Sequence, residues 1–380
     1  MRVLFLESFY GGSHREVLDE LVAHSAHDID TQTLPARFWK WRVRGSAAEF
    51  IHRIPDPSHY DLVALTGLTT VSDLRSFWGS MCPPILLYEH ETQLSYPVPQ
   101  GQTADANYGF TDVTNMIAAD HVAFNSHTHR DQFLGELPRF LRKFPDNRPM
   151  WAVPEIEAKS SVLYPGIRYE SANIESADVE STGPKPGMID HKIDQMPRPL
   201  IVWNHRWEFD KDPDSFFSAL RAVKATGRTF SLAVLGENFQ MQPKAFISAK
   251  EEFSDQIVQW GYLPAKSDYR RWLTRGDIVV STSIQENFGI SVLEAVAYGC
   301  WPLLPDRLSY PEIIPDAFHP SVLYNDVKDL VIRLLALIDG YRESGTNPGD
   351  QAALMDHARS FVWERQAAHF DALFEAVATG

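Results

Sequence analysis

Short apolar runs alternate along the chain with longer stretches in which apolar residues recur at helical spacing. Several short runs are continuous, which is typical of parallel strands covered by helices on both faces. They predict strands at residues 3–6, 62–65, 85–88, 122–124, 162–164, 200–203, 230–235, 257–260, 278–281 and 301–304. Helical spacing predicts helices at residues 212–226, 266–276, 290–298, 327–339 and about 351–377. This alternation predicts the α/β class, with doubly wound parallel sheets.

The series of strands is interrupted at residues 170–198, where apolar residues are few and Gly and Pro gather at 183–187. This composition is typical of a flexible linker. It divides the chain into an N-terminal unit at 1–169 and a C-terminal unit at 199–355. We expect two Rossmann-like units facing each other across a cleft, with ligands at the carboxyl ends of their strands. The last helical segment, 356–380, is expected to pack back on the N-terminal unit.

Composition narrows the location and the kind of partner. No apolar run approaches the roughly 20 residues needed to span a bilayer, and the N-terminus lacks the pattern of a secretory signal. The two cysteines, Cys82 and Cys300, match no zinc site. We therefore expect a cytoplasmic protein without a membrane partner. A formal net charge of −15 argues against indiscriminate nucleic-acid binding but is compatible with a local basic patch.

The most informative string runs from Ser281 to Ala295 and contains two glutamates, Glu286 and Glu294. Between them, Asn287-Phe288-Gly289 predicts a strand-to-helix turn, with the helix beginning near Ile290. Free N–H groups at that helix start can bind a diphosphate. Glu286 can accept hydrogen bonds from sugar hydroxyls, and Glu294 from ribose hydroxyls. Either glutamate alone is more simply a solvated residue of an amphipathic helix.

Two cations follow an earlier strand end, Arg206 and Lys211. Together they can neutralise the β-phosphate of a nucleotide sugar, at about 1.5–3 kcal/mol per charge-assisted hydrogen bond. On their own they could equally form a surface cluster with Glu208. The nearby Asp210-x-Asp212-x-Asp214 lacks the later ligands of a calcium loop, so we predict no metal site. Asp212 or Asp214 more simply caps the next helix, with Pro213 in its first turn.

Together these residues resemble the retaining glycosyltransferases of family 4, in which an Arg/Lys pair and an E-x7-E motif hold the donor. Gly236 and Tyr262 fall where that family places its nucleotide pocket. The resemblance implies the GT-B fold, with no required cofactor, no protein nucleophile and attack on the same face of the sugar as the departing phosphate.

The N-terminal half has its own candidate residues. Gly11 and Gly12 form a turn after the first strand, where backbone can approach a phosphate or a sugar closely. His90 follows another strand, among acidic and polar neighbours, and we interpret it as a sugar contact. His127 and His129 are expected to be surface residues.

Motifs over nearly the whole chain, the linker excepted, resemble the tRNA-queuosine mannosyltransferases. They include Phe9-Tyr10-Gly11-Gly12-Ser13-His14, His90-Glu91-x-Gln93-Leu94-x-Tyr96-Pro97, His205-Arg206-Trp207-Glu208-x-Asp210-Lys211 and Trp260-Gly261-Tyr262-Leu263. Thr92 stands where we would expect Asn, a change that could alter acceptor contacts. The resemblance implies transfer of mannose from GDP-mannose, with retention, to the cyclopentenediol of queuosine in a tRNA anticodon. It also implies acceptor contacts at Ser13, His14, Glu91, Gln93 and Tyr96.

Cations and aromatics interleave at two places that could bind RNA. The first contains Trp39, Lys40, Trp41, Arg42 and Arg44, and the second contains Arg142 and Lys143. Single-stranded RNA is held by stacking on aromatics and by cations along its backbone. An amphipathic helix with core tryptophans and solvated cations would give the same pattern.

The resulting hypothesis is a mannosyltransferase whose C-terminal half binds GDP-mannose, while Glu286 and His90 hold the mannose from opposite sides. Replacing Arg206 or Lys211 with Ala is expected to reduce turnover and leave the fold intact. Two alternatives stay open: a related enzyme with another nucleotide sugar or a small-molecule acceptor, and a non-catalytic RNA-binding protein on the same scaffold.

Overall fold

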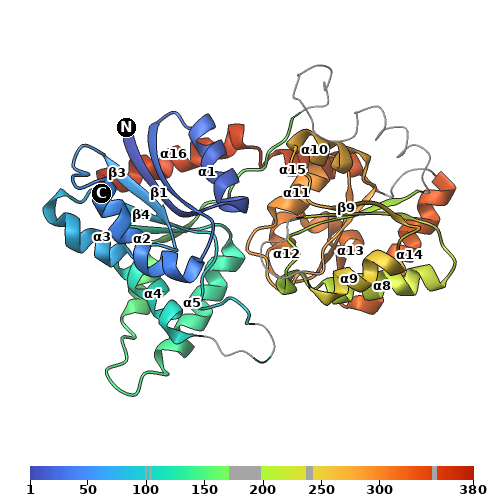
Figure 1. The fold of residues 1–380 in the computed structure, drawn as a ribbon, viewed down its shortest axis with the longest axis horizontal. Helices are drawn as coiled ribbons and strands as arrows, with labels where there is room; N and C mark the ends of the chain where they lie inside the picture. The colour runs from blue at the N-terminus through green and yellow to red at the C-terminus, as the bar shows by residue number, and fades with distance from the viewer. Residues whose placement is uncertain (99–100, 102–104, 171–197, 237–242, 345–348) are drawn as a thin grey trace. The chain divides into compact units, whose positions relative to one another are not determined.

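The computed structural model describes residues 1–98, 101, 105–170, 198–236, 243–344 and 349–380. These form two compact units, Met1–Gly166 with Phe361–Gly380, and Ile167–Ser360 (Figure 1). Nearly all of the predicted linker, 170–198, lies outside the described residues. In the part of the chain that the structure describes, no helix is long and apolar enough to cross a membrane.

Unit 1 is built on a six-stranded parallel sheet with the order β2-β1-β3-β4-β5-β6. The strands are β1 (Arg2–Tyr10), β2 (Asp28–Pro35), β3 (Leu62–Thr66), β4 (Ile85–Glu89), β5 (His121–Phe124) and β6 (Ser160–Val162). Its helices are α1 (Gly12–His24), α2 (Trp39–Arg53), α3 (Val71–Trp78), α4 (Ala106–Ala118), α5 (His127–Leu141), α6 (Ala152–Ala158) and α16 (Trp363–Thr379). The central strands β3 and β4 are buried along their whole length, as their continuous apolar sequences require.

Unit 2 repeats this architecture, with the strand order β12-β11-β10-β7-β8-β9. Its strands are β7 (Leu200–Asn204), β8 (Ser231–Leu235), β9 (Ile257–Gly261), β10 (Ile278–Val280), β11 (Trp301–Pro305) and β12 (Leu323–Tyr324). Its helices are α8 (Pro213–Ala225), α9 (Lys244–Glu252), α10 (Lys266–Arg275), α11 (Ile290–Ala297), α12 (Tyr310–Ile313), α13 (His319–Val322), α14 (Val327–Ser344) and α15 (Gln351–Arg359). The predicted α/β class with parallel sheets is confirmed in both units.

Three strands of the described residues differ from the sequence-based expectation. The edge strand β2 was not predicted, because its sequence DIDTQTLP is polar; it pairs through its backbone with β1. The two-residue strand β12 is too short to give a pattern. The strand expected at 162–164 lies at Ser160–Val162.

The helical stretch expected at 351–377 is two helices, because the helix breaks between Arg359 and Trp363. α15 belongs to unit 2 and packs on α11, whereas α16 belongs to unit 1 and packs on α1, β3 and β4. Figure 1 shows α16 in red beside α1. Trp363 lies so close to Gly166 that a Cβ there would be 2.4 Å from the indole ring.

Candidate active-site residues

In unit 2, the carboxyl ends of β7 and β10 bring the predicted donor residues together. The two strands are parallel neighbours at the point where the strand order reverses, which is where open α/β sheets bind ligands. The loop after β7 carries Arg206 and Lys211, and the loop after β10 carries Glu286. Residues 75 positions apart in sequence are therefore in contact, since Lys211 Nζ donates to Glu286 Oε2 at 3.2 Å.

Lys211 is buried among acceptors. Its Nζ also donates to the backbone oxygen of Gln285 at 2.7 Å and lies 3.3 Å from Asp210 Oδ2. Burial lowers the pKa of Lys211, but the carboxylates of Glu286 and Asp210 outweigh it, so that the pKa is raised overall. The ammonium is thus a fixed positive charge, held by two carboxylates and a carbonyl.

Arg206 differs from Lys211 in exposure. Its side chain is 44% exposed, with Nη1 3.4 Å from Glu208 Oε2 and Nη2 4.0 Å from Asp210 Oδ2. Asp210 itself is fully buried. Its carboxylate pairs with the buried Lys211 and with the partly exposed Arg206. The sequence did not single out Asp210 for this role.

The helix start predicted to receive a diphosphate is present at α11. Gly289 precedes it with φ of 104°, a conformation that favours glycine. The Ser309 hydroxyl holds the turn by donating to the backbone oxygen of Phe288 at 2.9 Å. Asn287 is nearly buried, and its side-chain oxygen accepts from Gln285 Nε2 at 2.8 Å. The backbone N–H groups from Ile290 onwards belong to the first turn of α11, where N–H groups have no acceptor within the helix.

Glu294 lies on α11, one turn from its start, and is part of a partly buried hydrogen-bond chain. Tyr269 donates to Glu294 Oε2 at 3.2 Å, and Asn204 Nδ2 donates to the Tyr269 hydroxyl at 3.0 Å. Burial raises the pKa of Glu294 to about 7, although Lys266 and Tyr269 act in the opposite direction. Its protonation state therefore changes near neutral pH.

The remaining predicted donor residues of unit 2 have separate positions. Gly236 ends β8 with φ of 146°, and a Cβ there would lie 1.9 Å from the backbone oxygen of His205. Tyr262 follows β9 and is 53% exposed. Of the two helix caps predicted, Asp212 or Asp214, the structure has Asp212, whose side chain accepts from the Ser215 N–H at 3.2 Å.

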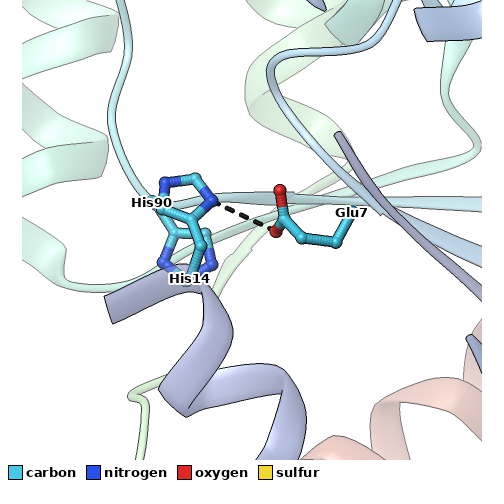
Figure 2. Close-up of side chains that lie close together, drawn as sticks. All are labelled: Glu7, His14 and His90. Carbon is cyan, nitrogen blue, oxygen red and sulfur yellow. Dashed lines mark hydrogen bonds and ion pairs between the residues drawn. The ribbon is translucent and has the colours of Figure 1, made fainter. Parts of the chain in front are cut away.

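In unit 1, Glu7, His14 and His90 come together at the carboxyl end of the sheet (Figure 2). Glu7 lies on β1, His14 lies in the first turn of α1, and His90 directly follows β4. His14 Nδ1 is 3.1 Å from Glu7 Oε2, and the His14 and His90 rings lie 4.1 Å apart between centroids. Donor atoms of the three side chains lie within 4.8 Å of one another, so they are a group that could also hold a metal ion.

His90 is held in its neutral form. Burial lowers its pKa well below the usual value, and His14 and His129 lower it further. A neutral imidazole can donate one hydrogen bond and accept one, which suits sugar hydroxyls better than phosphate. The backbone oxygen of His90 accepts from Asn125 Nδ2 at 3.0 Å, which fixes the loop.

In the turn next to this cluster, position 11 requires glycine for a steric reason. A Cβ on Gly11 would lie 2.4 Å from the Cβ of Ala36, so that side-chain-free backbone is needed there. Gly12 has φ of 54° and is exposed together with Ser13.

The expectation that both His127 and His129 lie on the surface is wrong for His129. His127 is exposed, but His129 is fully buried, with Nδ1 2.8 Å from Asn125 Oδ1 and Nε2 3.3 Å from the Thr92 hydroxyl. Burial lowers the pKa of His129 to about 3. Thr92, the departure from the family motif, therefore has its hydroxyl inside the loop.

Polar residues that were predicted to contact the acceptor follow His90 on the same loop. Glu91, Gln93 and Tyr96 are half-buried, and Gln93 Nε2 donates to Glu91 Oε1 at 3.4 Å. Beneath them, Glu89 and Asp112 are buried. Burial raises the pKa of Asp112 to about 8 and that of Glu89 well above its usual value. Sequence reasoning missed this buried acid pair, because the two residues lie on separate elements.

The predicted RNA-binding residues 39–44 begin α2. Trp39 packs on Tyr108 with ring centroids 4.9 Å apart, and Lys40 Nζ lies over both rings. Trp41 is 76% exposed and lines a hollow of about 420 Å³. The other lining residues are Leu34, Pro35, Arg42, Gly45, Glu49 and Arg53. One tryptophan is therefore packed and the other presents its ring to solvent.

The remaining cations predicted to bind RNA lie on different surfaces of their elements. Arg44 is exposed on α2, whereas Arg142 and Lys143 are exposed just after α5. The structure thus places the second cluster in the segment after α5, apart in sequence from α2.

Two protein families match the chain. Residues 2–167 match the family described as tRNA-queuosine alpha-mannosyltransferase N-terminal, and residues 190–353 match glycosyl transferases group 1. A tRNA-queuosine alpha-mannosyltransferase of Drosophila melanogaster is 34% identical over 335 residues, which cover 87% of this chain and 85% of the relative.

Solved structures resemble the chain at low sequence identity. A sucrose-phosphate synthase from Thermosynechococcus elongatus has a TM-score of 0.71 and 14% identity, with 100% of both chains covered. HepE from Anabaena, in complex with UDP and glucose, has a TM-score of 0.67 and 12% identity, with 99% of this chain and 100% of that chain covered. A glycosyltransferase from Rickettsia africae has a TM-score of 0.66 and 15% identity, covering 99% and 98%. At these identities the likeness shows the fold alone.

Proposed function

Because the chain belongs to the tRNA-queuosine alpha-mannosyltransferase family, we propose that it transfers mannose from GDP-mannose, with retention, to the cyclopentenediol of queuosine in a tRNA anticodon. The chain is a glycosyltransferase of the GT-B fold class, so the resemblance stated from its motifs is confirmed at that level. The donor, the acceptor position and the roles of individual residues are the content of the proposal.

The observation that carries the proposal is the contact between Lys211 and Glu286 beside the start of α11. A nucleotide sugar has a diphosphate next to a hydroxyl-rich ring, so its site needs fixed positive charge next to hydrogen-bond acceptors. Lys211, Arg206 and the N–H groups of α11 supply the first, and Glu286 supplies the second.

Leaving-group departure builds negative charge on the β-phosphate. Lys211 is already ionised and held by Asp210 and Glu286, so it needs no reorganisation when that charge develops. We assign Arg206 to the same phosphate from the solvent side. Both cations then stabilise the transition state more than the bound donor.

The proposed acceptor residues are in unit 1. His90 is proposed to contact the transferred sugar, and His14, Ser13, Glu91, Gln93 and Tyr96 the nucleoside. The exposed ring of Trp41, with Arg42 and Arg53 beside it, has the chemistry of a stacking platform for an unpaired nucleotide.

The experiment that tests the proposal uses labelled GDP-mannose and two tRNA pools, one containing queuosine and one lacking it. We expect label in the queuosine pool alone. Label from another nucleotide sugar, or label in the queuosine-free pool, would overturn the donor or the acceptor assignment respectively. Tight tRNA binding without any transfer would instead favour a non-catalytic RNA-binding protein.

A further inference from the structure

We propose that Glu7 is a positioning residue for this reaction: it fixes which nitrogen of His14 carries the proton, and thereby the hydrogen-bonding sense of the His14–His90 ring pair. This inference rests on the proposed function and deepens it on the acceptor side. Neither the sequence motifs nor the family likeness assigned a role to Glu7.

The carboxylate of Glu7 is fully buried, and both of its oxygens have defined partners. Oε1 accepts from the Phe9 N–H at 2.7 Å and from the Thr66 hydroxyl at 3.2 Å. Oε2 lies 3.1 Å from His14 Nδ1 (Figure 2). Because Oε1 already accepts two hydrogen bonds, we assign Oε2 as the acceptor of the third, which places a proton on His14 Nδ1.

A fixed proton on Nδ1 determines what the rest of the His14 ring can do. In a neutral imidazole with Nδ1 protonated, Nε2 is an acceptor. The ligand class suited to that atom is a hydroxyl group, as on the transferred sugar or the cyclopentenediol of the acceptor. A carboxylate that orients an imidazole in this way is a recurring device in catalytic sites.

Fixing the His14 ring also affects His90, whose ring packs on it. The His14 and His90 rings lie 4.1 Å apart with an interplanar angle of 32°, so movement of one displaces the other. Tyr88 also packs on His90, with ring centroids 4.9 Å apart and the ring planes nearly perpendicular. Glu7 therefore holds the pair at one end, while packing holds it at the other.

The variant Glu7→Gln tests this mechanism because it should reverse the tautomer. The single amide oxygen of Gln must serve the Phe9 N–H and the Thr66 hydroxyl, which leaves the NH2 group facing His14 Nδ1. Nδ1 then has to accept, and the proton moves to Nε2. We expect kcat to fall roughly 10–100-fold, as for loss of other groups that orient a functional histidine.

The first measurement is the tautomer of His14 in the full chain, from nitrogen-15 NMR at alkaline pH with EDTA present, assigned by comparison with His14→Gln. We expect the Nδ1-protonated form in the natural protein and the Nε2-protonated form in Glu7→Gln. The matched control is Glu20→Gln, a glutamate of the same helix that lies 3.7 Å from His24 and outside the site. An unchanged His14 signal in Glu7→Gln would overturn the proposal.

The second measurement is a double-mutant cycle on transfer activity. If Glu7 acts through His14, Glu7→Gln should lower kcat in the natural background and have no further effect in His14→Ala. Additive losses would overturn the proposal, as would natural activity in Glu7→Gln. If the natural protein transfers no mannose to queuosine tRNA, the proposed function fails, and the NMR result still decides whether Glu7 fixes His14.

Discussion

The two clusters at the ends of the two sheets are chemically unlike. The unit 2 cluster is charged: Lys211 is held between Asp210 and Glu286, with Arg206 beside it. In the unit 1 cluster the rings of His14 and His90 are paired, His90 is held neutral, and the Glu7 carboxylate contacts His14. Both lie at the carboxyl ends of parallel strands, between the neighbours β7 and β10 in unit 2 and across β1, β3 and β4 in unit 1.

This difference matches two different kinds of ligand. Fixed cations suit an anion such as a diphosphate, because their charge persists at every physiological pH. Neutral imidazoles suit hydroxyl groups, because each ring can donate and accept. The same fold therefore supports a site with fixed charges in one unit and a site with a neutral histidine in the other. A few side chains on the loops after the strands make this difference.

The largest expected effect comes from removing the exposed cation of unit 2. Arg206→Ala should lower kcat/KM roughly 10²–10³-fold, because the variant loses a hydrogen-bond donor that we assign to the negative charge developing on the β-phosphate. Its stability should stay within about 0.5 kcal/mol, since the side chain is 44% exposed. Steady-state kinetics and urea unfolding measure both. Arg221→Ala, an arginine of similar exposure paired with Glu252, is the matched control and should retain activity.

Lys211→Ala tests the contrast between the exposed Arg206 and the buried Lys211. The sequence led us to expect an intact fold in this variant, whereas the burial of Lys211 predicts a loss of stability. Removing the buried ammonium leaves Asp210 and Glu286 without their shared partner. Breaking a buried pair in this way costs about 3–5 kcal/mol. We therefore expect Lys211→Ala to lose activity and stability together, and equal stability of the two alanine variants would contradict the burial argument.

An intermediate effect is expected at Trp41, on the face of unit 1 that is proposed to bind RNA. Trp41→Ala should raise the KM for tRNA about 5–150-fold, which corresponds to the roughly 1–3 kcal/mol of one base stacked on an aromatic ring. The KM for donor should not change, because Trp41 lies in unit 1. Phe77→Ala, on the equally exposed face of α3, is the control. A higher KM for both substrates would point to a damaged fold rather than a lost stacking platform.

The smallest expected effect is a pH dependence of donor binding through Glu294. Its pKa is raised by burial from 4.5 to about 7, so its contribution to the free energy of unfolding is greatest below about pH 4.5 and declines as the pH rises to about 7. The proposed donor contact has the opposite requirement, because only an ionised Glu294 carboxylate would accept hydrogen bonds from both ribose hydroxyls. The KM for donor should therefore fall severalfold as the pH rises through about 7.

In Glu294→Gln the KM for donor should be nearly independent of pH over this range. Glu252→Gln, which changes an exposed carboxylate of the same unit, should keep the natural profile. A pH profile that survives in Glu294→Gln would assign the titration to another group.

Much of the scaffold follows from local sequence. Continuous apolar runs such as residues 62–65 and 200–203 predict buried parallel strands, because burial on both faces favours apolar side chains at every position. The cap at Asp212 and the glycine before α11 are also local, because the partner atoms lie within a few residues. The proposed donor-binding residues Arg206, Lys211, Glu286 and Glu294 could be listed for the same reason, since they fall in two short motifs.

Only the tertiary structure decided which of these residues are buried and which are paired. Arg206 and Lys211 look alike in sequence, yet one faces solvent and the other is enclosed by a loop 75 residues away. Glu7, His14 and His90 come together because β1 and β4 lie on either side of β3, an order that no local pattern encodes. The polar strand β2 and the buried His129 have the same explanation. Backbone pairing and burial depend on distant neighbours, so the sequence determined the elements and their motifs, and strand order determined their chemistry.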